Sequence, residues 1–170
     1  MKLMSQGTKS ILFGAHQFIV HPYFVYKAFK LCNYRKPQFW ELICIIIHDW
    51  GYWGMDYLID RKVENWRADD GHEKLGARIA LRLFGLQGYK FVMGHGGEAL
   101  RFHPKHRSAM YWPDKISSLI APRWWLQWTM IVEKFPIDVD TWRSEVIQRL
   151  RAEDIHFKDE EKYASFHYMF

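Results

Sequence analysis

Residues 39–52 read FWELICIIIHDWGY, an apolar run that ends in a histidine and an aspartate. The longest unbroken apolar stretch is Leu42 to Ile47, six residues, far short of the roughly 20 that a bilayer span requires. A helix over residues 39–47 is apolar on every face, and such a helix belongs in the interior of a protein. We therefore expect a buried central helix that ends at His48-Asp49, just before Gly51.

The rest of the chain has helical spacing of apolar residues, and no alternating run with hairpin signals predicts a sheet. Pro22 and Pro37 suit the first turns of helices, and Gly85 suits a helix end. The predicted fold class is all-α, a single-domain helical bundle over residues 1–152, followed by a polar, solvated C-terminal tail at 153–170. Further helices are expected at 10–20, 22–33, 72–84, 87–94, 108–119, 123–134 and 140–151, and loops at 50–71 and 96–107.

Composition narrows the function classes. A chain of 170 residues with 49% hydrophobic residues can bury one core, and two cysteines are too few for a disulfide framework. The net charge of +5 suits an anionic ligand but does not indicate duplex nucleic acid. We expect a cytoplasmic protein that neither spans nor binds a membrane, with tryptophans 112, 124, 125 and 128 packed mostly in the core; the sequence leaves the oligomeric state open.

Nine histidines are the feature that points to chemistry. Several of them, and two aspartates, stand at or near predicted helix ends on successive helices. Bundles bring such positions together, and bundle interiors commonly hold paired metal ions on imidazole and carboxylate ligands. The candidate ligands are His21, His48, Asp49, His72, His95 and Asp114.

This series resembles the HD-domain metal-dependent phosphohydrolase superfamily, over roughly residues 14–135. Residues 48–52 (HDWGY) resemble its His-Asp-x-Gly segment, residues 72–77 (HEKLGA) resemble the helix with its extra histidine, and residues 112–117 (WPDKIS) resemble the segment of its last aspartate. The resemblance implies an HD-type bundle that hydrolyses a phosphoester, foremost that of a nucleotide, through a metal-bound hydroxide.

The histidines at 72 and 95 resemble those of the binuclear subset of that superfamily. The resemblance implies one or two divalent ions, and imidazole with carboxylate suits iron, manganese, zinc, nickel or magnesium. It also implies that His21, His48 and Asp114 hold one ion, His72 and His95 the other, and that Asp49 is shared. Asp49 and Lys115 are the expected catalytic residues, with orientation of Asp114 as the alternative role for Lys115.

The expected partner is a small anionic molecule, held by a basic loop. Arg101 and Lys105, together with Arg107, Lys115 and Arg123, are candidates for phosphate contacts. Tyr52 stands where the cyclic-dinucleotide-cleaving members of the superfamily often carry a lysine, and Trp53 and Gly54 follow where its nucleotidase members often carry a glutamate. Tyr52 is therefore either a substitute hydrogen-bond donor to substrate or a packed aromatic.

The sequence leaves two other functions open. The same ligand pattern resembles HD-fold di-iron oxygenases of the myo-inositol oxygenase kind, which cleave C–C or C–P bonds with O₂. The third possibility is a nucleotide- or metal-binding module without turnover. His103 and His106 are spare loop candidates, whereas His16, His156 and His167 have no place in the pattern.

Overall fold

A computed structural model describes residues 4–55, 71–96, 104–135 and 137–153. Across these residues all regular structure is helical, with no strand, which confirms the all-α prediction. Short 3₁₀ turns at Trp50–Tyr52 and Pro104–His106 join longer helices. The α-helices are α1 (Gln6–Phe13), α2 (Val20–Asn33), α3 (Phe39–Ile47), α4 (Glu73–Met93), α6 (Tyr111–Ile120), α7 (Arg123–Glu133) and α8 (Val139–Ala152).

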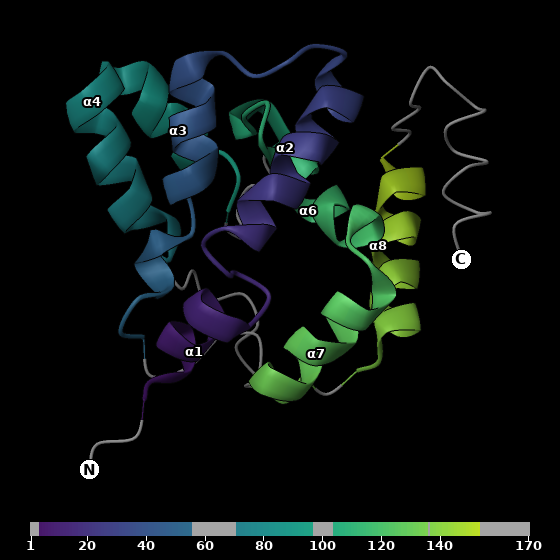
Figure 1. Cartoon of the computed structure of the whole chain (residues 1–170). Helices are drawn as coiled ribbons and strands as arrows, with labels where there is room; N and C mark the ends of the chain where they lie inside the picture. The colour runs from purple at the N-terminus through teal and green to yellow at the C-terminus, as the bar shows by residue number, and fades with distance from the viewer. Residues whose placement is uncertain (1–3, 56–70, 97–103, 136, 154–170) are drawn as a thin grey trace.

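Helix α2 lies at the centre of the bundle (Figure 1), with α3 and α4 on one side and α6 and α8 on the other. Its side chains enter three separate hydrophobic clusters. Phe29 packs with the α3–α4 side, Ala28 packs with α6 and α8, and Phe24 packs with α7 and the start of α8. Helices α1 and α7 pack against each other at one end of the molecule.

The start of α3 is fixed by Glu41, which is only 3% exposed. Its carboxylate accepts the Gln38 backbone N–H at 2.7 Å, as in a capping box, and accepts two hydrogen bonds of 2.6 Å from Arg35. The expectation that α3 is buried on every face is wrong, because within the described ranges its main helix contacts are with α2 and α4. Ile45 is fully buried, whereas the neighbouring Ile46 is 36% exposed.

Two glycines let the end of α3 approach the start of α4. A Cβ atom at Gly51 would lie 1.7 Å from the carbonyl oxygen of His72, and a Cβ atom at Gly76 would lie 2.4 Å from the carbonyl oxygen of Ile47. No side chain fits at those separations. The close approach therefore places His72 beside the residues that follow α3.

Some helix boundaries differ from the predictions. Helix α1 begins earlier than residue 10, because Ser5 caps it by accepting the Thr8 N–H, and it ends at Gly14, whose missing Cβ leaves room for the Glu133 carboxylate. Helix α2 begins at Val20, so His21 lies in its first turn rather than breaking a preceding helix. The predicted break at Gly85 is confirmed as a kink in α4 with φ of +68°.

The tryptophan prediction is only partly right. Trp112 and Trp125 pack against hydrophobic clusters, but Trp124 is 68% exposed and Trp128 is 50% exposed, because they lie on the face of α7 that turns away from the clusters. In the described part of the chain, no helix combines the length and the apolar character needed to cross a membrane. Helix α8 ends at Ala152, and residues 154–170 of the predicted tail lie outside the described residues.

Candidate metal centre

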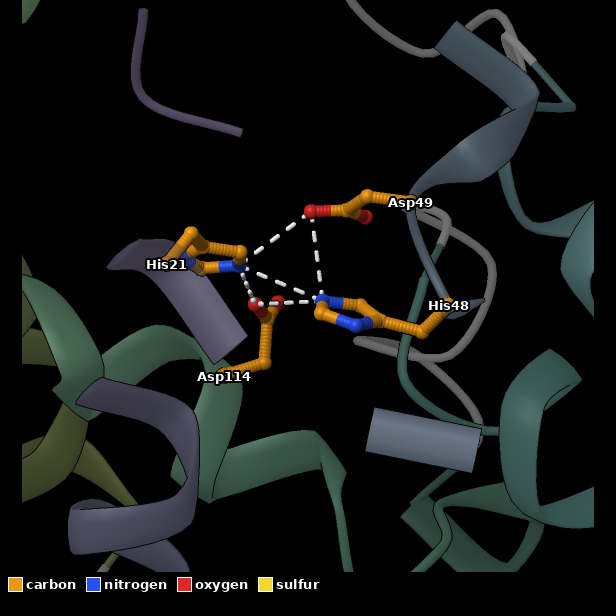
Figure 2. Close-up of side chains that lie close together, drawn as sticks. All are labelled: His21, His48, Asp49 and Asp114. Carbon is orange, nitrogen blue, oxygen red and sulfur yellow. Dashed lines mark hydrogen bonds and ion pairs between the residues drawn. The ribbon is translucent and has the colours of Figure 1, made fainter. Parts of the chain in front are cut away.

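Four of the predicted ligands meet where α2, α3 and α6 converge (Figure 2). His21 Nε2 lies 3.2 Å from Asp49 Oδ2 and 3.1 Å from Asp114 Oδ1. His48 Nε2 lies 3.2 Å from the same Asp49 oxygen and 3.5 Å from Asp114 Oδ1. We call His21, His48, Asp49 and Asp114 the first ligand group.

A second ligand group consists of Asp49, His72 and His95. The Nε2 atoms of His72 and His95 lie 3.6 and 3.5 Å from Asp49 Oδ1 and 3.2 Å from each other. Asp49 thus turns Oδ2 toward the first group and Oδ1 toward the second. The structure brings all six predicted ligands together, with Asp49 in the shared position.

Helix ends orient the ligand imidazoles. His48 Nδ1 donates to the carbonyl oxygen of Ile45 at 2.6 Å, and His95 Nδ1 donates to that of Val92 at 2.5 Å. Both acceptors lie three residues earlier, among the last carbonyls of a helix, which lack intrahelical partners. His72 lies beside a carboxylate instead, with its Nδ1 3.2 Å from Glu73 Oε2, which is a charge contact and not a hydrogen bond.

This arrangement suits a bound cation or a shared proton. An imidazole that donates through Nδ1 carries a lone pair on Nε2 when it is neutral, so His95 turns an Nε2 lone pair toward His72 Nε2, 3.2 Å away. The ligand atoms of each group lie within 4.8 Å of one another. Metal–ligand bonds of about 2.0–2.2 Å place opposite ligands about 4 Å apart, so the donor sets suit a metal ion in size and chemistry.

The two carboxylates are held in their ionised form. Burial alone would raise the pKa of Asp49, yet the surrounding histidines hold that pKa well below its ordinary value. Burial has the same effect on Asp114, where Lys115 and the histidines outweigh it and lower the pKa. Two negative charges in a buried histidine cluster give a donor set that a divalent cation neutralises.

The pKa values of the two buried imidazoles at the helix ends, His48 and His95, shift in opposite directions. Burial disfavours the charged form of His48, but Asp49 and Asp114 outweigh it and raise its pKa to about 10. Burial dominates at His95 and lowers its pKa to about 4. In the metal-free centre a proton is therefore held in the first group, while His95 stays neutral with its Nε2 lone pair available.

Lys115 lies directly on the first group. Its Nζ donates to Asp114 Oδ2 at 2.7 Å, which leaves Asp114 Oδ1 for the two histidines. The carboxylate outweighs burial and raises the pKa of Lys115, so the ammonium stays charged. The side chain is 36% exposed and can orient Asp114 while remaining accessible to an anion.

Tyr52 is a buried ring, 6% exposed, that stacks on His72 with 4.6 Å between ring centroids and 7° between planes. This contact is that of a packed aromatic that supports a ligand, and a role for Tyr52 toward substrate stays a prediction.

The predicted basic loop does not act as one unit among the described residues. Arg107 pairs with Glu153, and Arg123 pairs with Asp140. Lys105 lies on the wall of a pocket of about 650 Å³ that also reaches Lys90 and Glu73. Arg101 and His103 lie outside the described residues, so their predicted roles stay untested.

Two residues near the centre were not found from the sequence. Glu73 stands in the 72–77 segment that resembles the helix with the extra histidine, but no pattern in the sequence gives this carboxylate a role of its own. His16 was set aside because its spacing matches no ligand pattern, yet its ring centroid lies 5.8 Å from that of His21. Burial is the largest influence on the pKa of His16 and lowers it, while Asp49 opposes that effect.

Comparison of the chain with protein-family models, with curated proteins and with solved structures found no match in any of the three. The structure itself shows a helical domain with a buried cluster of histidines and aspartates that could hold metal ions.

Proposed function

We propose that this protein is a metal-dependent phosphohydrolase that cleaves a phosphoester of a small anionic substrate. The observation that supports the proposal most is the pair of ligand groups joined through Asp49, with one carboxylate oxygen toward each group. Enzymes that cleave phosphoesters commonly use two ions in this way.

Each ligand group would hold one ion. His21, His48 and Asp114 would complete the first with Asp49, and His72 and His95 would complete the second. Such ions, when bound, supply positive charge and make water a stronger nucleophile at neutral pH. Zinc, manganese and iron all accept imidazole and carboxylate ligands, so the donor set leaves the metal open.

The chain itself contributes charge and orientation. Lys115 keeps Asp114 in place and offers an ammonium at the edge of the centre, where it can bind a phosphate oxygen. In the overall reaction water adds to phosphorus, the ester P–O bond breaks, and the alcohol leaves with a proton. A nucleotide is the proposed substrate because the His-Asp-x-Gly segment resembles that of the HD-domain phosphohydrolases.

One observation favours a second candidate, a di-iron oxygenase. Tyr52 stacks on His72 at the position where the cyclic-dinucleotide-cleaving members of the HD-domain superfamily often carry a lysine, and Trp53 and Gly54 follow where its nucleotidase members often carry a glutamate. A shared carboxylate between two histidine-rich groups also suits two iron ions. This candidate requires iron and O₂, whereas the phosphohydrolase requires neither.

The test is phosphate release by the full chain loaded separately with manganese, zinc, iron(II) or magnesium. A panel of nucleoside mono- and triphosphates and cyclic dinucleotides serves as substrate, and Asp49→Asn serves as the inactive variant. Asp140→Asn is the matched control, because Asp140 is an exposed carboxylate paired with Arg123.

The proposal expects phosphate or nucleoside release under anaerobic conditions by the wild type and Asp140→Asn, but not by Asp49→Asn. No release with any metal refutes it. Two irons per chain with a mixed-valent EPR signal and O₂ consumption would support the oxygenase instead. Tight nucleotide binding without turnover in every metal would support a non-catalytic module.

A further inference from the structure

A hydrogen-bonded cluster outside both ligand groups joins α1, the turn after it and α7. Ser10 and Glu133 are buried at 0% and 3% exposure, although they stand 123 residues apart in the chain. Ser10 Oγ lies 2.5 Å from Glu133 Oε1 and 2.7 Å from His16 Nδ1. The Ala15 backbone N–H donates to the same Glu133 oxygen at 2.7 Å, which fixes the carboxylate in place.

The position of each proton follows from this arrangement. The Ser10 hydroxyl donates its single proton to Glu133 Oε1. Ser10 Oγ must then accept from His16, which places the imidazole proton on Nδ1. His16 Nε2 therefore carries a lone pair, and it has no hydrogen-bond partner in the described part of the chain.

His16 lies at the edge of the candidate metal centre. Its ring packs on Tyr52 with 4.1 Å between centroids, and Tyr52 in turn stacks on His72. Its ring also meets the His21 ring edge-on. His16 thus adjoins His21 of the first ligand group, and Tyr52 contacts both His16 and His72 of the second. The His16 side chain is 25% exposed, so the ring is open to a bound molecule.

We propose that His16 offers Nε2 as a hydrogen-bond acceptor to the water or hydroxyl group that reacts at this centre. Ser10 and Glu133 are positioning residues that fix its tautomer and the direction of its ring. This inference rests on the proposed function, since it assigns a role beside the same ligand groups.

The first test is the tautomer of His16, measured by long-range ¹H–¹⁵N NMR on the metal-free full chain. The expected result is a proton on Nδ1 in the wild type and a shift toward Nε2 protonation in Ser10→Ala. Ser118→Ala is the matched control, because Ser118 is likewise a helical serine whose hydroxyl donates a hydrogen bond, here to the carbonyl oxygen of Lys115 on α6. A wild-type proton on Nε2, or no change in Ser10→Ala, overturns the inference.

The second test compares two substitutions of His16 in the metal-loaded protein. Asn keeps an amide near the position of Nδ1 and removes Nε2, whereas Gln extends its amide to about the position of Nε2. We expect His16→Asn to lower kcat at least about tenfold with KM little changed, and His16→Gln to retain more activity. Metal content and thermal stability should match the wild type in both.

The outcomes separate the two proposals. Hydrolysis by the wild type with equal kcat in His16→Asn overturns the role of His16 and leaves the phosphohydrolase standing. Lower kcat in His16→Asn accompanied by metal loss also overturns it, because His16 would then be structural. No hydrolysis by the wild type in any metal overturns the proposed function itself, while the NMR result still decides the tautomer.

Discussion

Replacing Asp49 by Asn should remove metal-dependent stabilisation of the protein. Asp49 is buried, with 5% of the residue exposed, and it is the one residue common to the two ligand groups among the described residues. Asn keeps the shape but loses the charge, and its amide turns an N–H donor toward one of the histidine pairs. We therefore expect both ions to be lost while the fold persists.

The two ligand groups set the size of the effect. An ion present at a hundred times its Kd stabilises the native state by about 2.7 kcal/mol, and two such ions contribute about twice that. For a chain of this length each kcal/mol corresponds to about 2–4 °C in Tm. Saturating metal should therefore raise the wild-type Tm by about 5–11 °C for one ion and about 11–22 °C for two.

The assay is thermal unfolding with chelator and with added manganese or zinc, for the wild type and three variants. Asp49→Asn should show almost no metal-dependent change in Tm. His95→Asn should keep about half of the wild-type change, because His95 belongs to the second group only. Asp140→Asn should keep all of it. An equal metal-dependent change in Asp49→Asn and the wild type would refute the assignment of Asp49 as the shared ligand.

Three further predictions concern stability and metal affinity. Glu41→Gln should destabilise the protein by about 1–2 kcal/mol at neutral pH, because the cap of α3 loses its charge. Burial opposes ionisation of Glu41, but the hydrogen bonds from Arg35 and the Gln38 backbone outweigh burial and lower the pKa of Glu41. The stabilisation by the ionised carboxylate is therefore complete above pH 4.5 and is lost as pH falls below that value. Urea unfolding across pH 3–7 should show the free energies of unfolding of the wild type and Glu41→Gln becoming equal in acid. Ile45→Ala should lower the free energy of unfolding by about 2–4 kcal/mol in the same assay, because Ile45 is fully buried. Ile46→Ala, on the exposed side of the same helix, should lower it by under about 1 kcal/mol. Equal losses in the two variants would contradict the packing of α3. Glu73→Gln should weaken metal binding about 10- to 100-fold by loosening His72, as measured by chelator competition; an unchanged Kd would show that the carboxylate does not orient that ring.

Much of the fold was accessible from the sequence because helix ends carry local signals. Gly85 bends α4 through its own backbone freedom, and Pro37 precedes the α3 start that was predicted at Phe39. The start of α1 was missed because its cap, Ser5, has no apolar repeat beside it to mark the helix. The exposure of Ile46 could not be predicted, since the number of helices that cover α3 is a property of tertiary packing.

The residues of the candidate site likewise fall into those that the sequence predicts and those that it does not. Its ligands were found because each stands at or near a helix end and their order along the chain matches a known pattern. His16 and Glu133 were not, because their meeting depends on the packing of α1 against α7, which joins residues more than a hundred positions apart. The sequence pattern identifies residues that have the same local role at helix ends. Contacts between residues far apart in the chain become known only from the folded structure.

The two ligand groups differ in how much of the chain each one ties together. The second lies within residues 49–95, entirely on the α3–α4 side of the bundle, whereas the first joins α2, the end of α3 and α6. An ion in the first group would thus link α3 and α6 through the central helix α2, whereas an ion in the second group would hold together only the end of α3 and the two ends of α4. Hydrogen exchange should distinguish them: loss of the first ion should speed amide exchange in α6 and the start of α2, and loss of the second should speed exchange at the two ends of α4.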